Sequence, residues 1–366
     1  MIAFLPSIYP NELFYSLIAR YHVRTGRADV GTDIGSFYSD RYNVPPDFEF
    51  IGKLREDIFP VLLDRISFTD PAAAAAYTQS EDRLRYLVNH HTLFPYYSRF
   101  MPLDRRREAY EALCAMDTYR MYRRLPIPQR RKERYARYCS LCAAEAREQY
   151  GEAYWSTIHN LFGVNVCPVH GCRLMAAKGL RIIPRMKAGL LPAEDVIPYG
   201  EEPVISDNKT EIRLAQYVAE VFQSPLSLDN DTPIGEYLQS RLMPPYVTPR
   251  GERRHMERLQ NDFHRMYEGI DLDGFGDIIQ LTYIFEGKRV TPNEICALAM
   301  LIGISPDDLS APVLPKIGRT EAIDRAIREL RGKGYTYKQI AAELGLPLYT
   351  CKDVGGDRCR RRVSNR

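Results

Sequence analysis

The sequence contains no apolar run long enough to cross a membrane as a helix. None of its stretches approaches the roughly 18 consecutive apolar residues that such a helix needs, although 45% of the 366 residues are hydrophobic. The start of the chain, MIAFLPSIYPNELFYS, has no basic region before its short apolar patch and no small-residue cleavage site after it. We therefore expect an intracellular protein whose eight cysteines stay reduced and are available as metal ligands.

The motifs of several enzyme classes are also absent. The chain has no GxxxxGKS or GxxxxGKT phosphate-binding loop and no HExxH metalloprotease motif. The string DLDGFGD at 271–277 lacks the ligand spacing and the final glutamate of a calcium-binding loop. Spacing does not exclude a nuclease of the DDE type, because its acids lie far apart in sequence. We expect no enzyme activity and name no catalytic residue, with a DNA-processing enzyme as the weaker alternative.

Two pairs of metal-ligand residues lie in the stretch 138–174. Cys139-x-x-Cys142 and Cys167-x-x-His170 have the two-residue gaps that let both members of a pair converge on one tetrahedral zinc ion. Four protein ligands leave no open position for water, so the ion would brace the fold and take no part in catalysis. The sequence therefore predicts one structural Zn²⁺ ion as the cofactor.

Other interpretations of this stretch stay open. The spacing could arise by chance or serve redox chemistry, although no thioredoxin-like alternation of strands and helices surrounds Cys139. Cys172 lies two residues beyond His170 and could replace it as a ligand. The residues between the two pairs, which include the only tryptophan, Trp155, follow a helical pattern.

The rest of the chain predicts a mainly α-helical protein of several domains. Its length exceeds the size at which one core usually keeps growing, and apolar residues recur at three- and four-residue intervals. The predicted parts are a helical domain over 1–178 with a zinc finger at 138–174, a linker at 179–209, a helical domain over 210–310, and a helix-turn-helix domain with a basic tail over 311–366. The domain over 210–310 is either a helix-turn-helix or a small bundle. Helices are predicted over 13–25, 51–63, 71–88, 104–124, 210–223, 232–242, 250–268, 291–302, 322–330 and 336–344, with further helices starting at 305 and 347.

Basic residues concentrate in two regions, although the formal net charge is only +3. Arginine and lysine outnumber the acids over 99–137 and over 319–366, and tyrosines lie among them. Clustered arginine with interleaved tyrosine suits phosphate contact and base stacking, with a solvated helical face as the alternative. In the first region the candidate DNA-binding residues are Arg130, Arg131 and Lys132.

The last fifty residues have the pattern of a helix-turn-helix. Thr336 caps one helix, Gly345 supplies a sharp turn, and Pro347 begins a further helix that would enter the major groove. A helical protein-interaction domain is the alternative. The residues placed to meet base edges are Tyr349, Thr350, Lys352 and Asp353, and those placed to meet phosphates are Lys333, Lys338, Arg358, Arg360, Arg361 and Arg362.

Two adjacent histidines, His90 and His91, lie in or beside the aromatic stretch NHHTLFPYYSRFMP at 89–102. Adjacent histidines in such a stretch are more often packing and hydrogen-bonding residues than metal ligands or catalysts. We therefore expect both of them to pack.

Several stretches in the first half of the chain resemble one known family. NELFYSLIAR at 11–20, HTLFPYYSRFMP at 91–102, and YCSLCAAEAREQYGEAYW joined to VCPVHGCRL resemble the TniQ/TnsD family of Tn7-like transposon proteins. The likeness covers about the first 175 residues. Carried over residue by residue, it implies that the metal ligands are Cys139, Cys142, Cys167 and His170, although Ser140-Leu141 stand where proline and an acidic residue are common.

The resemblance implies a target selector of transposition. Family members bind an attachment site in double-stranded DNA or join an RNA-guided complex, and they recruit an AAA+ ATPase regulator, which engages the transposase. It also implies a location in the bacterial cytoplasm at the nucleoid, and an ATPase contact on the N-terminal helices. The basic carboxyl end favours a TnsD-like protein that reads DNA itself, while a TniQ-type adaptor for a CRISPR RNA-guided effector is the alternative. The chain is also shorter than the longest TnsD-type members.

Overall fold

The computed structural model describes residues 4–26, 47–52, 54–127, 134–182, 190–248, 253–272, 275–288, 291–315 and 319–354. Within these ranges the chain is mainly helical, as predicted, with one short antiparallel sheet. It divides into two compact units: Met1–Asp231 with Thr291–Asn293, and Thr232–Val290 with Glu294–Arg366. None of the described helices is both long and apolar enough to cross a membrane.

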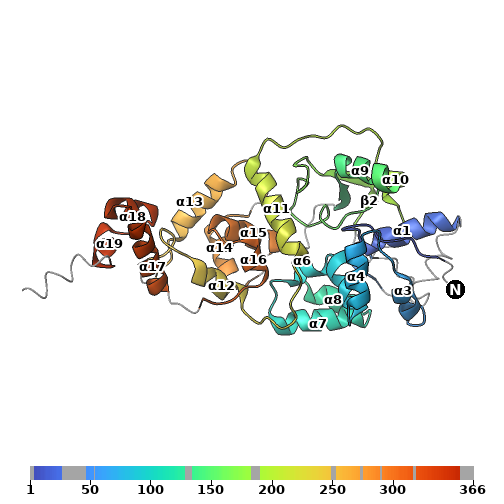
Figure 1. Cartoon of the computed structure of the whole chain (residues 1–366), viewed down its shortest axis with the longest axis horizontal. Helices are drawn as coiled ribbons and strands as arrows, with labels where there is room; N and C mark the ends of the chain where they lie inside the picture. Colours follow the sequence, from blue (N-terminus) through green and yellow to red (C-terminus); the bar gives the residue numbers. More distant parts are fainter. Residues whose placement is uncertain are drawn as a thin grey trace, which may run out of the picture. The chain divides into compact units, whose positions relative to one another are not determined.

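The first unit holds most of the long helices and the sheet (Figure 1). Its strands β1 (Tyr135–Tyr138) and β2 (Met175–Arg181) pair with Tyr138 opposite Met175, and so they enclose the stretch with the predicted metal ligands. The helices of this unit are α1 (Phe14–Thr25), α3 (Phe59–Arg65), α4 (Pro71–Gln79), α5 (Arg83–His91), α6 (Phe94–Ser98), α7 (Leu103–Cys114), α8 (Thr118–Arg124), α9 (Ser140–Tyr150), α10 (Ala193–Val196) and α11 (Lys209–Gln223).

Helix α1 forms where the sequence predicts it. Every residue from 14 to 22 is buried, so this is a core helix and not a surface one. It ends at Gly26, whose φ of 64° lies in the left-handed region that glycine adopts at little cost.

Two long predicted helices are each divided in two, which corrects the prediction. Within 71–88, Asp82 accepts a hydrogen bond from a backbone N–H in the next turn and so caps a new helix, α5. Within 104–124, Met116 has a left-handed φ of 56° and interrupts the chain between α7 and α8. In each case the apolar periodicity continues through the break. A polar cap or a left-handed residue nevertheless ends one helix and starts the next.

One further stretch differs from the prediction, and the aromatic stretch 89–102, which is not among the predicted helices, contains a short one. Of the helix expected over 51–63, the helical part is α3, which has Pro60 in its first turn. The aromatic stretch 89–102 contains helix α6, whose N-terminus is stabilised by the Thr92 hydroxyl accepting a hydrogen bond from a backbone N–H.

The residues between the two ligand pairs are helical only in α9. This helix ends at Gly151, which has a φ of 82°, so Trp155 lies outside it in an irregular segment, contrary to the helical pattern. The Trp155 side chain is fully buried, and its indole N–H donates to the backbone oxygen of Leu191 at 2.8 Å. Packing of this large side chain, and not helix formation, fixes the segment.

Three arginines fix the chain just before the end of the first unit. Arg99, Arg106 and Arg107 each donate hydrogen bonds to backbone carbonyls of the segment 222–230, with Arg106 to Ser227 at 2.7 Å. Arg99 and Arg106 are both only 5% exposed. These contacts use part of the 99–137 basic region in folding, and burial makes Arg99 and Arg106 unavailable for phosphate contact, whereas Arg107 is exposed.

The second unit consists of helices and their connections within the described residues. The phenol of Tyr267 donates to the backbone oxygen of Ala297 at 2.7 Å and ties two of its helices together. Its helices are α12 (Ile234–Arg241), α13 (Met256–Met266), α14 (Ile278–Phe285), α15 (Pro292–Leu301), α16 (Pro306–Ser310), α17 (Arg319–Gly332), α18 (Tyr337–Glu343) and α19 (Leu348–Val354).

The last three helices, α17, α18 and α19, form one group (Figure 1). Thr336 caps α18 through a capping box with Gln339, as expected of an N-cap threonine. Gly345 turns the chain with a φ of 60°, and a Cβ atom there would lie 2.9 Å from the Cβ of Pro245. A side chain at position 345 is therefore excluded both by backbone conformation and by space. The common core of the group comprises Ile323, Ile327, Ile340, Leu346 and Cys351.

The two adjacent histidines pack, as predicted. His91 is 4% exposed, and its Nδ1 lies 2.7 Å from the backbone oxygen of Glu12. The ring of the more exposed His90 lies 4.4 Å from that of Tyr86. Burial lowers the pKa of His91 to about 4, so this imidazole is neutral at pH 7 and donates its Nδ1 proton to the carbonyl.

We expect His91→Gln to remove a pH dependence of stability. In the folded state the pKa of His91 is about 4, whereas the unfolded chain has the ordinary value near 6.5. The wild type therefore keeps its full stability above pH 6.5 and loses up to about 3 kcal/mol relative to the variant as the pH falls to 4. Urea unfolding of both proteins at pH 7, 5.5 and 4.5 measures this difference. A difference that stays constant with pH would contradict it.

Candidate metal centre

The first ligand pair is positioned by the junction of a strand and a helix. Cys139 follows β1 and is the N-cap of α9, and its Sγ accepts a hydrogen bond from the backbone N–H of Cys142 at 3.4 Å. Hydrogen bonds from Cys142 and Cys167 lower the pKa of Cys139, and the partial positive charge of the α9 N-terminus acts in the same direction. One helical turn thus brings both sulfurs to the same side.

The second pair has the same local geometry. The Sγ of Cys167 accepts a hydrogen bond from the backbone N–H of His170 at 3.4 Å, and Gly171 donates its N–H to the backbone oxygen of Cys167 at 2.8 Å. Gly171 has a φ of 66°, and a Cβ there would lie 3.1 Å from a side-chain carbon of Ile212. The glycine therefore allows the tight turn that directs both ligands of the pair inward.

The four predicted ligands come together at the separations of a tetrahedral site. Zinc bonds of about 2.3 Å to sulfur and 2.0–2.1 Å to nitrogen separate two sulfurs by about 3.8 Å and a sulfur from a nitrogen by about 3.6 Å. The sulfurs of Cys142 and Cys167 lie 3.7 Å apart. His170 Nδ1 lies 3.6 Å from the sulfur of Cys139, 3.2 Å from that of Cys142 and 3.8 Å from that of Cys167.

A carboxylate fixes the orientation of His170. Glu145, one turn after the first pair on α9, has an oxygen 3.0 Å from His170 Nε2. Burial alone would lower the pKa of His170, but the hydrogen bond to Glu145 and the nearby Cys139 raise it overall. With the Nε2 proton directed at Glu145, Nδ1 is left to face the three sulfurs, as in many metal sites where a carboxylate supports a histidine ligand.

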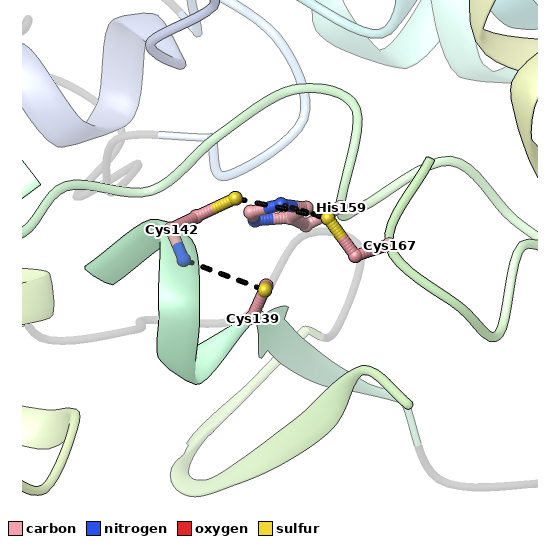
Figure 2. Close-up of side chains that lie close together, drawn as sticks. All are labelled: Cys139, Cys142, His159 and Cys167. Carbon is pink, nitrogen blue, oxygen red and sulfur yellow. Dashed lines mark hydrogen bonds between the residues drawn. The ribbon is translucent and has the colours of Figure 1, made fainter. Parts of the chain in front are cut away.

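Sequence reasoning missed one further residue of this centre, His159. Its Nε2 lies 3.7 Å from the Cys167 sulfur, and the ligand atoms of Cys139, Cys142, His159 and Cys167 all lie within 4.8 Å of one another. Figure 2 shows the sulfurs of Cys142 and Cys167 directed at each other, with the His159 imidazole beside them. His159 is outside both spaced pairs, so the only signal in the sequence is that a histidine falls between them.

The alternative ligand Cys172 also reaches the centre. Its sulfur is buried and lies 3.2 Å from that of Cys139. Burial raises the pKa of the Cys172 thiol to about 12, whereas hydrogen bonds from Cys142 and Cys167 lower that of Cys139. The pKa values of Cys142 and Cys167 are raised too, so protonation does not single out Cys172. In its protonated form Cys172 can donate a hydrogen bond to the Cys139 sulfur.

The chemistry of these donors decides which ions could bind. Three thiols and one or two imidazoles suit zinc and other soft or borderline transition-metal ions, while magnesium and calcium require oxygen ligands. A cation needs the thiolate forms, so metal affinity falls as the pH falls. The cluster of Cys139, Cys142, His159 and Cys167 could therefore hold a metal ion.

The centre is joined to the N-terminal segment by a buried polar network. Arg20 on α1 is 2% exposed and pairs with Glu12 at 2.9 Å and with Glu152 at 2.8 Å. Glu152 lies just after α9, and the phenol of Tyr9 donates to it at 2.8 Å. The two stretches 11–20 and 138–155 therefore fold as one body.

Some of the predicted DNA-binding residues lie within the described part of the chain. Lys333 lies just after α17, Lys338 lies on α18, and both are exposed. On α19, Tyr349, Lys352 and Asp353 are exposed and Thr350 is half-buried. The predicted residues Arg130, Arg131, Lys132, Arg358, Arg360, Arg361 and Arg362 lie outside the described residues.

Comparison with known proteins supports the resemblance found in the sequence. Residues 3–174 match the TniQ family model. Over 168 residues the chain is 28% identical to the transposition protein TnsD of transposon Tn7 from Escherichia coli, a match that covers 45% of this chain and 30% of that protein. The matched part of the chain contains the buried network and the candidate metal ligands described above. Residues 3–174 of this chain are therefore similar to the TniQ family.

Proposed function

We propose that the protein is a target selector of a Tn7-like transposon, which binds double-stranded DNA at an attachment site and recruits the transposition machinery. Its similarity to a transposition protein supports the general role. The observation that supports sequence-specific DNA binding is the exposed polar side of α19 within the group α17–α19. Proteins that read DNA with a helix-turn-helix place such a side against base edges.

Helix α19 has the two-sided character that a recognition helix needs. Cys351 is fully buried in the core of the group, whereas Tyr349 is 61% exposed on the other side. Lys352 and Asp353 are exposed beside it and carry donors and acceptors that can meet base edges. Lys333 and Lys338, exposed on neighbouring parts of the same group, are suited to phosphates.

The proposed partners are the DNA, an AAA+ ATPase regulator, and through it the transposase. We place the protein in the bacterial cytoplasm at the nucleoid, because target selection takes place on the chromosome. Its role is binding, without catalysis of its own. An adaptor role for a CRISPR RNA-guided effector is the second candidate, and it is favoured by the same N-terminal family match.

For the metal centre we propose one structural Zn²⁺ ion held by Cys139, Cys142, Cys167 and His170. The support is the distance of His170 Nδ1 from three sulfurs, together with its orientation by Glu145. His159 then acts as a hydrogen-bond donor to the Cys167 sulfur. Such an ion would hold the strand, helix and turn of the centre together.

The ligand assignment predicts an order of zinc affinities. Elemental analysis of the wild type should give about one zinc per chain. In competition with a chelator, His170→Gln should weaken zinc binding by more than about 100-fold, because it removes a direct ligand. His159→Gln should weaken it by about tenfold, as for loss of a supporting hydrogen bond. Cys172→Ser is the matched thiol control and should retain zinc. Greater loss in His159→Gln than in His170→Gln would reverse the assignment.

The DNA-reading proposal separates two lysines. Lys352→Ala should lower affinity for the target site by about 1–3 kcal/mol and relax its specificity, since a base contact is lost. Lys333→Ala should weaken binding to all sequences and reduce the salt slope by about one, since a phosphate contact is lost. Fluorescence anisotropy with target and random duplexes at several salt concentrations measures both. Equal wild-type affinity for the two duplexes would reject site reading.

A further inference from the structure

A cavity of 280 Å³ lies beside the metal centre in the first unit. Its lining comes from the turn at Pro10, the end of β1 with helix α9, the segment 154–159, Val169 and Ile197. All of these except Ile197 lie within residues 3–174, which match the family model. The cavity reaches the surface, because Val169 is 65% exposed on its rim.

The lining is aromatic and electron-rich. Tyr138, Tyr150 and Tyr154 contribute their rings, and Asn11, Gln149 and Glu145 contribute polar groups. Among the described residues that line the cavity, none is lysine or arginine. Three thiolates and a neutral imidazole around the proposed Zn²⁺ ion would add a net charge of −1 to one wall, which includes Cys139 and Cys142.

The charge and the aromatic rings select for a cationic occupant. Phosphate groups would meet negative charge and no basic side chain, so nucleic acid is disfavoured here. A guanidinium or ammonium group would be stabilised both by the negative charge and by a cation–π contact with the face of a tyrosine ring. The same aromatic cluster already holds one guanidinium: Arg20 lies 3.7 Å from the ring of Tyr9, which stacks on Tyr150 at 4.3 Å.

The apolar parts of the cavity indicate what accompanies the cation. Ile158 and Ile197 line it and are buried, and the exposed side chain of Val169 stands at its rim. Apolar surface left open next to polar groups is typical of a site for a protein partner. An extended segment with an apolar residue beside a basic one would cover both kinds of surface.

We propose that this cavity is a docking site for a segment of a partner protein in which arginine or lysine stands next to an apolar residue. The basic side chain enters over the tyrosine rings toward Glu145, and the apolar side chain covers Val169. The docking site would be the place where the partner recruitment proposed above occurs. Only its biological role depends on that proposed function. It is independent of DNA reading.

Saturation-transfer NMR with small probes tests the site on the full-length, zinc-loaded protein. The first probe is N-acetyl-leucyl-arginine amide, and the second replaces arginine with citrulline, which has nearly the same shape but no charge. The arginine probe should bind at least about fivefold more tightly, since it adds one opposite charge at close range. Equal binding of both probes, or no binding of the arginine probe, would overturn the proposal.

A pair of variants locates the binding. Gln149→Lys adds a positive charge on the lining, whereas Ala144→Lys adds the same charge on the exposed part of α9 that does not line the cavity. Gln149→Lys should weaken the arginine probe by about fivefold, and Ala144→Lys by less than about twofold. Zinc content and circular dichroism of each variant confirm that folding is unchanged.

Two results from the variants would contradict the docking site. Equal effects of Gln149→Lys and Ala144→Lys would place the probe elsewhere on the surface. Binding of a short oligothymidylate that becomes tighter in Gln149→Lys would assign the cavity to nucleic acid instead. Since no target DNA is used with the lysine variants, failure here would leave the DNA-reading proposal intact.

Discussion

The buried guanidinium of Arg20 is the constraint on which the N-terminal half of this protein depends. It contacts Glu12 and Glu152, from stretches more than a hundred residues apart in sequence, and is almost fully removed from water. Loss of one partner from such a buried pair costs about 3–5 kcal/mol in general, because the other charge is left uncompensated. Helix α1 and the segment after α9 are therefore held in one arrangement, and α9 connects that segment to the candidate metal ligand Cys139 at its N-terminus.

The two compact units differ in the features they contain. The first unit contains the buried network, the candidate metal ligands and a cavity rich in tyrosine. The second unit ends in a small helical group whose core needs only a few apolar residues, with polar side chains exposed on α19. In the proposed function, the first unit holds a protein partner while the second reads DNA.

Much of this could be predicted from the sequence, and the exceptions have physical causes. The spacing of Cys139, Cys142, Cys167 and His170 predicted that these four side chains lie close together, and they do because each pair spans one tight turn. His159 could not be found in this way, since it reaches the centre through the tertiary fold. Helix breaks were also missed, because apolar periodicity continues across a polar cap such as Asp82. The mainly helical class followed from periodicity that covers most of the chain.

The proposed function requires that this protein selects its DNA target by itself. The most direct measurement is a footprint of the purified protein on DNA that spans the insertion site of its element, with random DNA as competitor and without guide RNA. The account predicts protection of one defined segment on both strands, centred where α19 lies in the major groove. If the protein alone gives no protection, and protection appears only after an RNA-guided complex is added, autonomous target selection is contradicted. The protein would then be an adaptor.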